Sequence, residues 1–433
     1  MLKSNSALAA LLSSTALLTA GCATAQPASP IPVTSPTPTA STSAQDMSIT
    51  VLEFGGPNVL FAADQASNQV IAFELEELPD ETGNLESVPY NLTGLGQALA
   101  AHLDVSPFEI VYNDLAVHPV TMAAFLSLSI SGDEAPGSAV VMVTPDGSME
   151  TLDLMGLAHS SIALGNTPDA DVTFWRDIPA TSLSVTDFEY DNGTLYIAGL
   201  STGEFASTLR QVAYPFDGST ETTSIEMFHT AHNQNETRAP IRAMAMADIG
   251  GEKTLVAAYT CTPLVTIPEG ALEDGAHVVG KTIAELGYGN RPLEVLSLTA
   301  YNMERQPEDF VLVINREMSA NLIRVEDMAG APGITTAFSG LGDTLGIEGT
   351  HVPFAGTLQA ADQDAQFILT LRRNIDTGDV DLISSMKGVY FRLSDFVSEY
   401  TFPDYTYGEN QAGTKMFHNM VKPMEGYGDL VIE

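Results

Sequence analysis

Two histidines and a glutamate stand close together in Phe228–Arg242, a segment that reads FHTAHNQNETRAPIR. His229, His232 and Glu236 offer two imidazoles and a carboxylate, which are ligands of zinc, copper and other divalent metals when a loop folds back on itself. Their spacing differs from the helical H-E-x-x-H pattern, and the Asn, Gln and Thr neighbours indicate a loop. A divalent-metal site and a purely structural loop both stay open. We expect the structural loop, in which the two imidazoles point apart or form hydrogen bonds with the backbone.

Softer metal ligands occur in two further places. Cys261 is a lone thiol among apolar neighbours, which is typical of an inert core residue, although a thiol can also bind a soft metal or sense oxidants. A second cluster near the C terminus consists of Met416, His418, Met420 and Met424. These side chains could bind copper, or they could simply fill gaps where a C-terminal tail packs on the propeller. We assign no cofactor with certainty, and a divalent metal is the one candidate.

The elements that must position these residues read as short strands. Six pairs of apolar runs, each separated by a polar turn, recur about 60 residues apart, a little longer than the ~40–50 residues of a typical propeller blade. The pairs begin at Val59 and Val70, Met122 and Ala139, Leu195 and Leu209, Leu255 and Leu264, Val311 and Leu322, and Phe367 and Val380. Runs that are continuously apolar indicate strands buried on both faces.

We therefore predict an all-β fold, a β-propeller of six to eight four-stranded blades with seven favoured. A pair of β-sandwiches is the rival, but it would not require the ~60-residue period. We expect the strand near Ser48–Phe54 to close the ring by joining the last blade around Gly388–Leu393. Helical periodicity is confined to Thr93–Leu103 and to fragments near Ile283–Leu286.

The central channel of a propeller, lined by the first strand of each blade, is where we expect a ligand. Five segments read as such strands: Tyr112–His118, Ser184–Phe188, Pro240–Met244, Arg291–Val295 and Gly349–His351. They would bring to the channel Asp114, His118, Asp187, Arg242, Arg291, Glu294 and His351. Acids mixed with two arginines suit a polar ligand or a cation, and equally a structural ring of salt bridges.

Several segments resemble a family of exported bacterial β-propellers that has no assigned activity. They are Val185–Ala198, the FHTAH…ET…PIR and AAYTCTPL stretches, and Gly280–Leu293. The resemblance covers residues 185–300 and implies the propeller fold, but it implies no reaction. Motifs for nucleophilic hydrolysis (G-x-S-x-G) and covalent haem (C-x-x-C-H) are absent from the sequence.

The N terminus reads as a secretory signal, with Lys3, an apolar run and small residues before Cys22. The ending Thr-Ala-Gly-Cys resembles the bacterial lipobox, which implies that Cys22 carries lipid after cleavage. An ordinary secretory signal with an incidental cysteine is the alternative. Ala23 stands where an Asp would retain a lipoprotein in the inner membrane, so the resemblance implies the outer membrane. We expect a signal peptide over 1–21, a lipidated Pro/Ser/Thr-rich tether over 22–46, the propeller over 47–400 and a tail packed on it over 401–433.

The net charge of the chain limits which partners it can bind. The chain has 55 acidic and 17 basic residues and a net charge of −38, a balance that repels nucleic acid and anionic lipid headgroups. We expect a propeller anchored by lipid to the outer membrane that binds an envelope protein or a small ligand. Two alternatives stay open: a metal-dependent enzyme of the lactonase or sugar-oxidising kind with its site in the channel, and periplasmic metal handling.

Overall fold

The computed structural model describes residues 29–30 (backbone only), 47–76, 87–131, 137–169, 171–174, 178–260, 262–287, 291–301, 306–316, 318–337, 344–352, 354–387 and 405–416. The expected signal peptide and Cys22 lie outside these residues, as do Cys261 and the segment 388–393. Of the C-terminal Met/His cluster, Met416 alone is among them, and its side chain is exposed.

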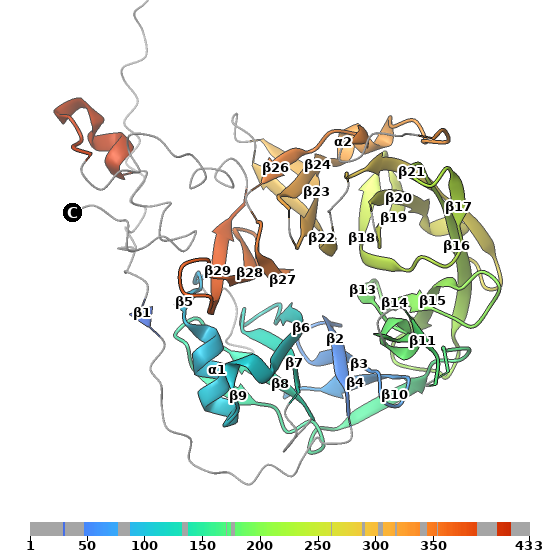
Figure 1. Ribbon diagram of the computed structural model, residues 1–433, viewed down its shortest axis with the longest axis horizontal. Coiled ribbons are helices and arrows are strands. Elements are labelled where there is room, and N and C mark those ends of the chain that lie inside the picture. The colour runs from blue at the N-terminus through green and yellow to red at the C-terminus, as the bar shows by residue number, and fades with distance from the viewer. Residues whose placement is uncertain are drawn as a thin grey trace, which may run out of the picture.

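Six four-stranded blades surround a central axis (Figure 1). The first consists of β2 (Ile49–Phe54), β3 (Val59–Asp64), β4 (Gln69–Glu74) and β10 (His159–Ala163). The second consists of β6 (Ile110–Val117), β7 (Ala124–Ile130), β8 (Gly137–Val143) and β9 (Met149–Thr151). The third consists of β13 (Asp187–Asp191), β14 (Thr194–Leu200), β15 (Ser207–Ala213) and β16 (Glu221–His229).

The chain continues around the axis with three more blades. The fourth consists of β18 (Ile241–Ile249), β19 (Glu252–Tyr259), β20 (Pro263–Pro268) and β21 (His277–Glu285). The fifth consists of β22 (Pro292–Tyr301), β23 (Pro307–Asn315), β24 (Ala320–Arg324) and β26 (Thr350–Val352). The sixth consists of β27 (Thr357–Asp362), β28 (Phe367–Arg373), β29 (Val380–Met386) and β5 (Asn91–Thr93), with β1 (Ser29–Pro30) pairing alongside β5.

The described residues also form smaller elements. They are α1 (Leu95–Leu103), α2 (Val325–Ala329), β11 (Thr173–Phe174), β12 (Ile178–Pro179), β17 (Gln234–Glu236), β25 (Leu345–Gly346) and the 3-10 turns Pro107–Glu109, Ala180–Leu183, Glu269–Ala271 and Glu409–Gln411. Among the described residues, no helix is long and apolar enough to cross a membrane.

Each pair of neighbouring blades encloses one hydrophobic core. Between the first and second blades, for example, Leu52 and Leu60 belong to one cluster with Phe125 and Val140. Five further clusters lie between the first and third, third and fourth, fourth and fifth, fifth and sixth, and sixth and second blades. Burying a large apolar side chain in this way contributes roughly 1.5–3 kcal/mol, so the cores hold the blades in a closed ring.

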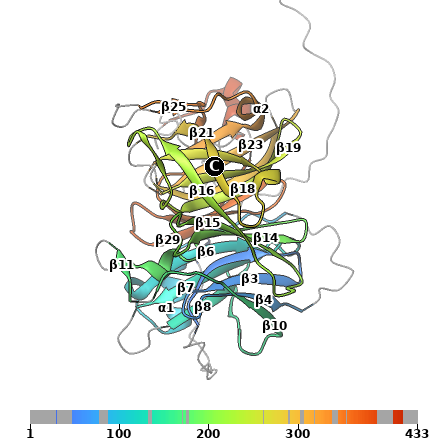
Figure 2. The ribbon, with the colours of Figure 1, turned by 90° about the vertical axis from the view of Figure 1, so that its right-hand side faces the viewer.

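The predicted propeller fold is confirmed, and six blades fall within the predicted range, although seven was favoured. The six hairpins of the sequence analysis are β3–β4, β7–β8, β14–β15, β19–β20, β23–β24 and β28–β29, the two middle strands of every blade. The outer strands β16 and β21 also pair in parallel, which joins the third and fourth blades into one sheet. Figure 2 shows both strands on the outside of the molecule.

The predicted closure is wrong. The strand Ile49–Phe54 is the inner strand of the first blade, and the strand that ties an early part of the chain to the last blade is β5, where Leu92 pairs with Leu382 of β29. The chain then builds the second blade and returns as β10 to complete the first. Since an outer strand needs only a few paired residues, β5 left too weak a pattern to be recognised.

The two predicted helices have different outcomes. The helix expected over Thr93–Leu103 is confirmed as α1. The helical fragments expected near Ile283–Leu286 are wrong, because Ile283 lies in the outer strand β21, where neighbouring residues pair with β20. The β-branched residues Val278, Val279 and Thr282 on this strand favour a sheet over a helix.

Candidate ligand site in the central channel

A cavity of about 200 Å³ opens where the six inner strands meet. Inner strands β2, β13, β18, β22, β27 and β6 lie side by side in that order, and each contributes lining residues. Six carboxyl side chains face this cavity: Glu53, Asp114, Asp187, Glu189, Glu294 and Asp362. Inner strands of this fold point alternate side chains at the axis, so one acidic residue in an apolar strand suffices to place a carboxyl there.

Three of these carboxyls brace neighbouring blades. Each accepts a hydrogen bond from a backbone N–H on the inner strand of the next blade. The pairs are Leu52 N with Asp114 Oδ2 at 2.7 Å, Met244 N with Asp187 Oδ2 at 2.6 Å, and Met246 N with Glu189 Oε1 at 3.0 Å. Because inner strands of different blades share no backbone ladder, these bonds satisfy N–H groups that would otherwise lack a partner within the protein.

Burial makes the channel carboxyls reluctant to ionise. It raises the pKa of Asp114 to about 6 and that of Glu189 to about 7. Burial also raises the pKa values of Glu53, Asp187 and Glu294, and repulsion from neighbouring carboxylates raises them further. The channel therefore holds fewer negative charges at neutral pH than it has carboxyls, and its protonated members can donate hydrogen bonds.

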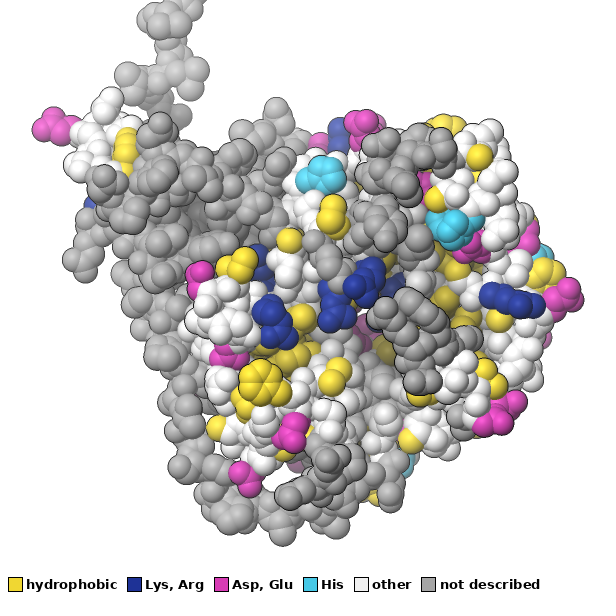
Figure 3. All heavy atoms as spheres, viewed as in Figure 1, with side chains coloured by type: hydrophobic (Ala, Val, Ile, Leu, Met, Phe, Trp, Pro, Cys, Tyr) yellow, Lys and Arg dark blue, Asp and Glu magenta, His cyan; other side chains and the backbone are white. Residues whose placement is uncertain are grey.

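Exposed arginines gather at the end where β18 and β22 begin. Arg242 is the second residue of β18, Arg291 directly precedes β22, and Arg316 follows β23, which runs antiparallel to β22. Burial lowers the pKa of Arg242, Asp187 and Asp114 oppose that change, and the guanidiniums of Arg316 and Arg291 add to it. Figure 3 shows Lys and Arg side chains gathered over the centre of the ring. At this end, the mouth of the channel, Arg242 is exposed to solvent, although the surrounding protein still removes part of its hydration.

The structure brings most of the predicted channel residues together. Asp114, Asp187 and Glu294 line the cavity. Arg242 and Arg291 are not among its lining residues, but Arg242 lies near Asp187 and Asp114, and Arg291 lies near Arg242.

Two predicted channel residues lie elsewhere. His118 directs both ring nitrogens at backbone groups, with Nε2 2.8 Å from the Pro57 oxygen and Nδ1 3.1 Å from the Val120 nitrogen. His351 is exposed on β26, the outermost strand of the fifth blade, where it contacts Ser319. The segment Gly349–His351 is thus an outer strand and not an inner one.

Sequence reasoning missed three channel carboxyls, those of Glu53, Glu189 and Asp362. Glu53 was overlooked because its strand was assigned to the closure, and Asp362 because β27 was not recognised as an inner strand. A signal was present: each of the six inner strands carries an acidic residue ahead of a predicted hairpin, and in five of them such a residue lines the cavity.

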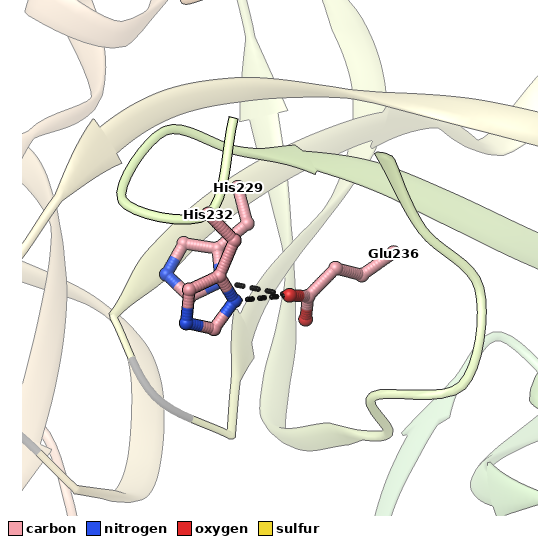
Figure 4. A group of neighbouring side chains, drawn as sticks. All are labelled: His229, His232 and Glu236. Carbon is pink, nitrogen blue, oxygen red and sulfur yellow. Dashed lines mark hydrogen bonds and ion pairs between the residues drawn. The ribbon is translucent and has the colours of Figure 1, made fainter. Parts of the chain in front are cut away.

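The expected orientation of the two imidazoles in the His/Glu loop is also wrong. Ligand atoms of His229, His232 and Glu236 all lie within 4.8 Å of one another, and the two imidazole centroids are 4.0 Å apart. The nearby imidazole of His229 lowers the pKa of Glu236 to about 2, and His232 contributes to that shift. Figure 4 shows both rings turning a nitrogen toward the same carboxylate oxygen. The imidazoles therefore point together and not apart.

Fold and site define the class of this protein as a six-bladed β-propeller with a polar central channel. No family model matches the chain, and no curated protein matches it in sequence. Among solved structures it is similar to PorZ, a surface component of the type-IX secretion system of Porphyromonas gingivalis, at 9% identity and a TM-score of 0.30, over 79% of this chain and 37% of that chain. It is also similar to Kuenenia stuttgartiensis hydrazine synthase, at 11% identity and a TM-score of 0.32, over 81% of this chain and 99% of that chain. A third similar structure is Drosophila Semaphorin 1b, at 9% identity and a TM-score of 0.35, over 82% of this chain and 87% of that chain. Likenesses this distant carry no argument about function.

Proposed function

We propose that this protein is an exported, lipid-anchored binding module whose central channel receives a small polar ligand. One observation carries the proposal: all six inner strands converge on a cavity that is lined by carboxyls, and Arg242, with Arg291 and Arg316 near it, lies close to two of these carboxyls, Asp187 and Asp114. Concave sites with a few convergent polar groups and perturbed pKa values are where proteins bind small molecules.

The polarity of the channel indicates the chemistry of the ligand. Arginines at the mouth suit a carboxylate or phosphate, which a guanidinium binds through paired, charge-assisted hydrogen bonds. Carboxyls deeper in the channel accept hydrogen bonds from hydroxyl groups, and when protonated they also donate them. A small hydroxylated acid, such as a sugar acid, combines both features within a cavity of about 200 Å³.

The proposal is tested by calorimetric titration of the full chain with D-gluconate, which carries one carboxylate and several hydroxyls. Sorbitol is the matched probe without the carboxylate, and we expect it to bind more weakly. Arg242→Gln should weaken gluconate binding ~10–100-fold, the loss of one or two charge-assisted hydrogen bonds. Arg324→Gln is the control, because Arg324 pairs with Glu326 on the outer part of the fifth blade. Equal affinity in both variants, or no heat with gluconate, would contradict the proposal.

Anchoring and location belong to the same proposal and are supported by the sequence. Cys22 after Thr-Ala-Gly is the expected lipidation point, and Ala23 favours the outer membrane. Cys22→Ser should release soluble protein or leave unprocessed precursor, which membrane fractionation and mass measurement distinguish from the wild type. If Cys22→Ser has the mass and membrane association of the wild type, Cys22 is not a lipid anchor. An envelope protein that binds the mouth of the channel is the alternative to a small ligand, and it would compete with gluconate.

A second candidate, a channel enzyme, rests on the pKa values of two lining residues. Glu189 at about 7 and Asp114 at about 6 can exchange a proton near neutral pH, as general acid–base catalysis requires. Hydrolysis of glucono-δ-lactone by the wild type, lost in Glu189→Gln, would favour this function. If the wild type binds gluconate but does not hydrolyse the lactone, the binding module is supported and the lactonase is not.

A further inference from the structure

The His/Glu group lies on the outer rim of the ring, away from the channel. His229 ends β16, the outermost strand of the third blade, and Glu236 ends β17, which folds back on β16 so that His229 pairs with Gln234. His232 occupies the turn between the two strands. The hairpin therefore explains why these three residues meet.

The geometry of the three ligand groups suits one small ion. His229 Nδ1 lies 3.2 Å from Glu236 Oε1, and His232 Nδ1 contacts the same oxygen. An ion bound ~2.0–2.2 Å from each nitrogen and oxygen leaves tetrahedral ligand atoms ~3.3–3.5 Å apart. Figure 4 shows the two imidazoles close together, each turning a nitrogen toward the same Glu236 oxygen. Small side-chain movements are enough to bring all three atoms to bonding distance.

A relay of hydrogen bonds orients His229 from behind. Its Nε2 lies 3.3 Å from the Thr262 hydroxyl, and that hydroxyl donates to Glu285 at the end of β21. The Glu285 carboxylate itself is 3.8 Å from Nε2 and also accepts from the Thr230 backbone N–H. Metal-binding histidines characteristically donate their second N–H to such a carboxylate, directly or through a hydroxyl. His229 and Glu285 are buried, so the relay is held by the packing of the third and fourth blades.

The same relay leaves the other nitrogen of His229 facing an acceptor. Because the Thr262 hydroxyl donates to Glu285, it can accept only from an N–H on Nε2, which in a neutral imidazole leaves Nδ1 with a lone pair. That lone pair points at a carboxylate oxygen 3.2 Å away. Two acceptors at this distance repel unless a cation lies between them. The cation is either an additional proton on the imidazole or a metal ion.

We propose that His229, His232 and Glu236 bind one divalent transition-metal ion of the zinc class. Two imidazoles and one carboxylate form a borderline-soft ligand set, which prefers Zn²⁺ to the oxygen-seeking Mg²⁺ and Ca²⁺. The side chain of His232 is 53% exposed, so the ion reaches the site from solvent and retains an open position for water. By tying the β16–β17 hairpin to Glu285, the ion fastens the third blade to the fourth.

The test is calorimetric titration of the EDTA-stripped full chain with zinc chloride near neutral pH. We expect one zinc ion per chain and no comparable binding of Mg²⁺. Thr262→Val breaks the relay while keeping the shape of the side chain, and it should weaken zinc binding ~10–100-fold. His232→Ala removes a ligand from an exposed turn, where folding is least affected, and it should weaken binding further. Zinc should also raise the melting temperature of the wild type but not of His232→Ala.

His159→Ala is the matched control, because His159 is also exposed, on β10, and its Nδ1 lies near a backbone oxygen. It should bind zinc as tightly as the wild type. The proposal is overturned if the wild type takes up no zinc, or if His232→Ala and His159→Ala bind it equally well. In the first case a proton is the cation between His229 and Glu236.

Discussion

At the scale of single residues, the channel carboxyls combine two roles. Asp114, Asp187 and Glu189 accept backbone hydrogen bonds from neighbouring inner strands, and the same side chains give the cavity its polarity. Leaving those N–H groups without partners would cost roughly 1–3 kcal/mol each, which offsets part of the cost of burying a carboxyl. The brace therefore keeps acidic groups in the channel whether or not a ligand is bound.

Glu189→Gln tests the cost of that burial. Burial raises the pKa of Glu189 from 4.5 to about 7, so between these values the folded protein holds a proton that the unfolded chain releases. The wild type consequently loses stability as the pH rises through this window. Gln keeps the acceptor for Met246 N and does not ionise. We expect Glu189→Gln to be more stable than the wild type by about 1–2 kcal/mol at pH ~8, after allowance for solvent in the channel, and to lose this advantage at pH ~4.5.

Chemical denaturation at both pH values measures this difference. Glu150→Gln is the control, because Glu150 is exposed on the outermost strand of the second blade. A Glu189→Gln variant that is less stable than the wild type at pH ~8 would show that the ionised carboxylate is stabilising.

Arg210 illustrates a buried charge satisfied by backbone alone. Its guanidinium donates to the carbonyl oxygens of Ser184, Gly165 and Leu200 at 3.2–3.4 Å, and burial lowers its pKa to about 10. Arg210→Met fills a similar volume but leaves the carbonyls without these donors. We expect a loss of about 3 kcal/mol in the free energy of unfolding, measured by urea denaturation. Arg324→Met on the surface should change it by less than about 0.5 kcal/mol, and an equally small effect at Arg210 would contradict the argument.

At the scale of elements, the middle strands of every blade could be predicted, because they are buried on both faces and their apolar runs are unbroken. Inner strands were harder to recognise. Where a polar residue interrupts the run, as Glu53 does in β2, the pattern resembles an edge strand facing solvent. Outer strands such as β26 are short and partly polar, so the inner-strand assignment of His351 failed.

The favoured number of blades failed for a related reason. The segment after β4 supplies β5 to the sixth blade and α1 beside it, so it adds no further blade. The partner of a strand that pairs far along the chain is decided by packing in three dimensions, and local periodicity carries no information about it. The meeting of His229 with His232 was missed similarly, since it depends on the β16–β17 hairpin.

Tyr90 tests how the ring is closed. It directly precedes β5, is fully buried, and its hydroxyl donates to the Met122 or Val143 carbonyl oxygen, at 2.8 and 2.9 Å, while accepting from Ala124 N. These contacts fasten the sixth blade to the second. Tyr90→Phe keeps the ring but leaves the three backbone groups without this partner, so we expect the free energy of unfolding to fall by about 1–3 kcal/mol.

Denaturant titration checks the expected loss. Tyr301→Phe is the matched control, because Tyr301 ends β22 with its side chain exposed, and it should leave stability unchanged. If Tyr90→Phe is as stable as the wild type, the hydroxyl does not contribute to closure and the apolar core between the two blades is sufficient.

At the scale of the whole molecule, the two signs of charge are distributed unequally. The chain carries −38 overall, yet three of its 17 basic residues, Arg242, Arg291 and Arg316, meet at the mouth of the channel. An anionic ligand approaching from afar is repelled by the acidic surface and attracted only near this mouth. Salt screens the repulsion over a Debye length of about 10 Å at 0.1 M, so binding of an anion should become faster as ionic strength rises from very low values.

The same repulsion acts within the folded protein and predicts how its stability depends on salt. Compact packing brings like charges closer than they are in the unfolded chain, so a net charge of −38 opposes folding most strongly where screening is weakest. We expect the melting temperature to rise as NaCl is increased from about 20 mM to about 1 M, where the Debye length is ~3 Å.

A variant in which the exposed residues Glu150, Glu204, Glu221 and Glu348 are changed to Gln should melt at a higher temperature at low salt and gain less from added salt. Differential scanning calorimetry measures both. If the melting temperatures of the two proteins depend on salt identically, salt acts through the hydrophobic cores between the blades. If neither melting temperature changes with salt, surface charge does not determine stability.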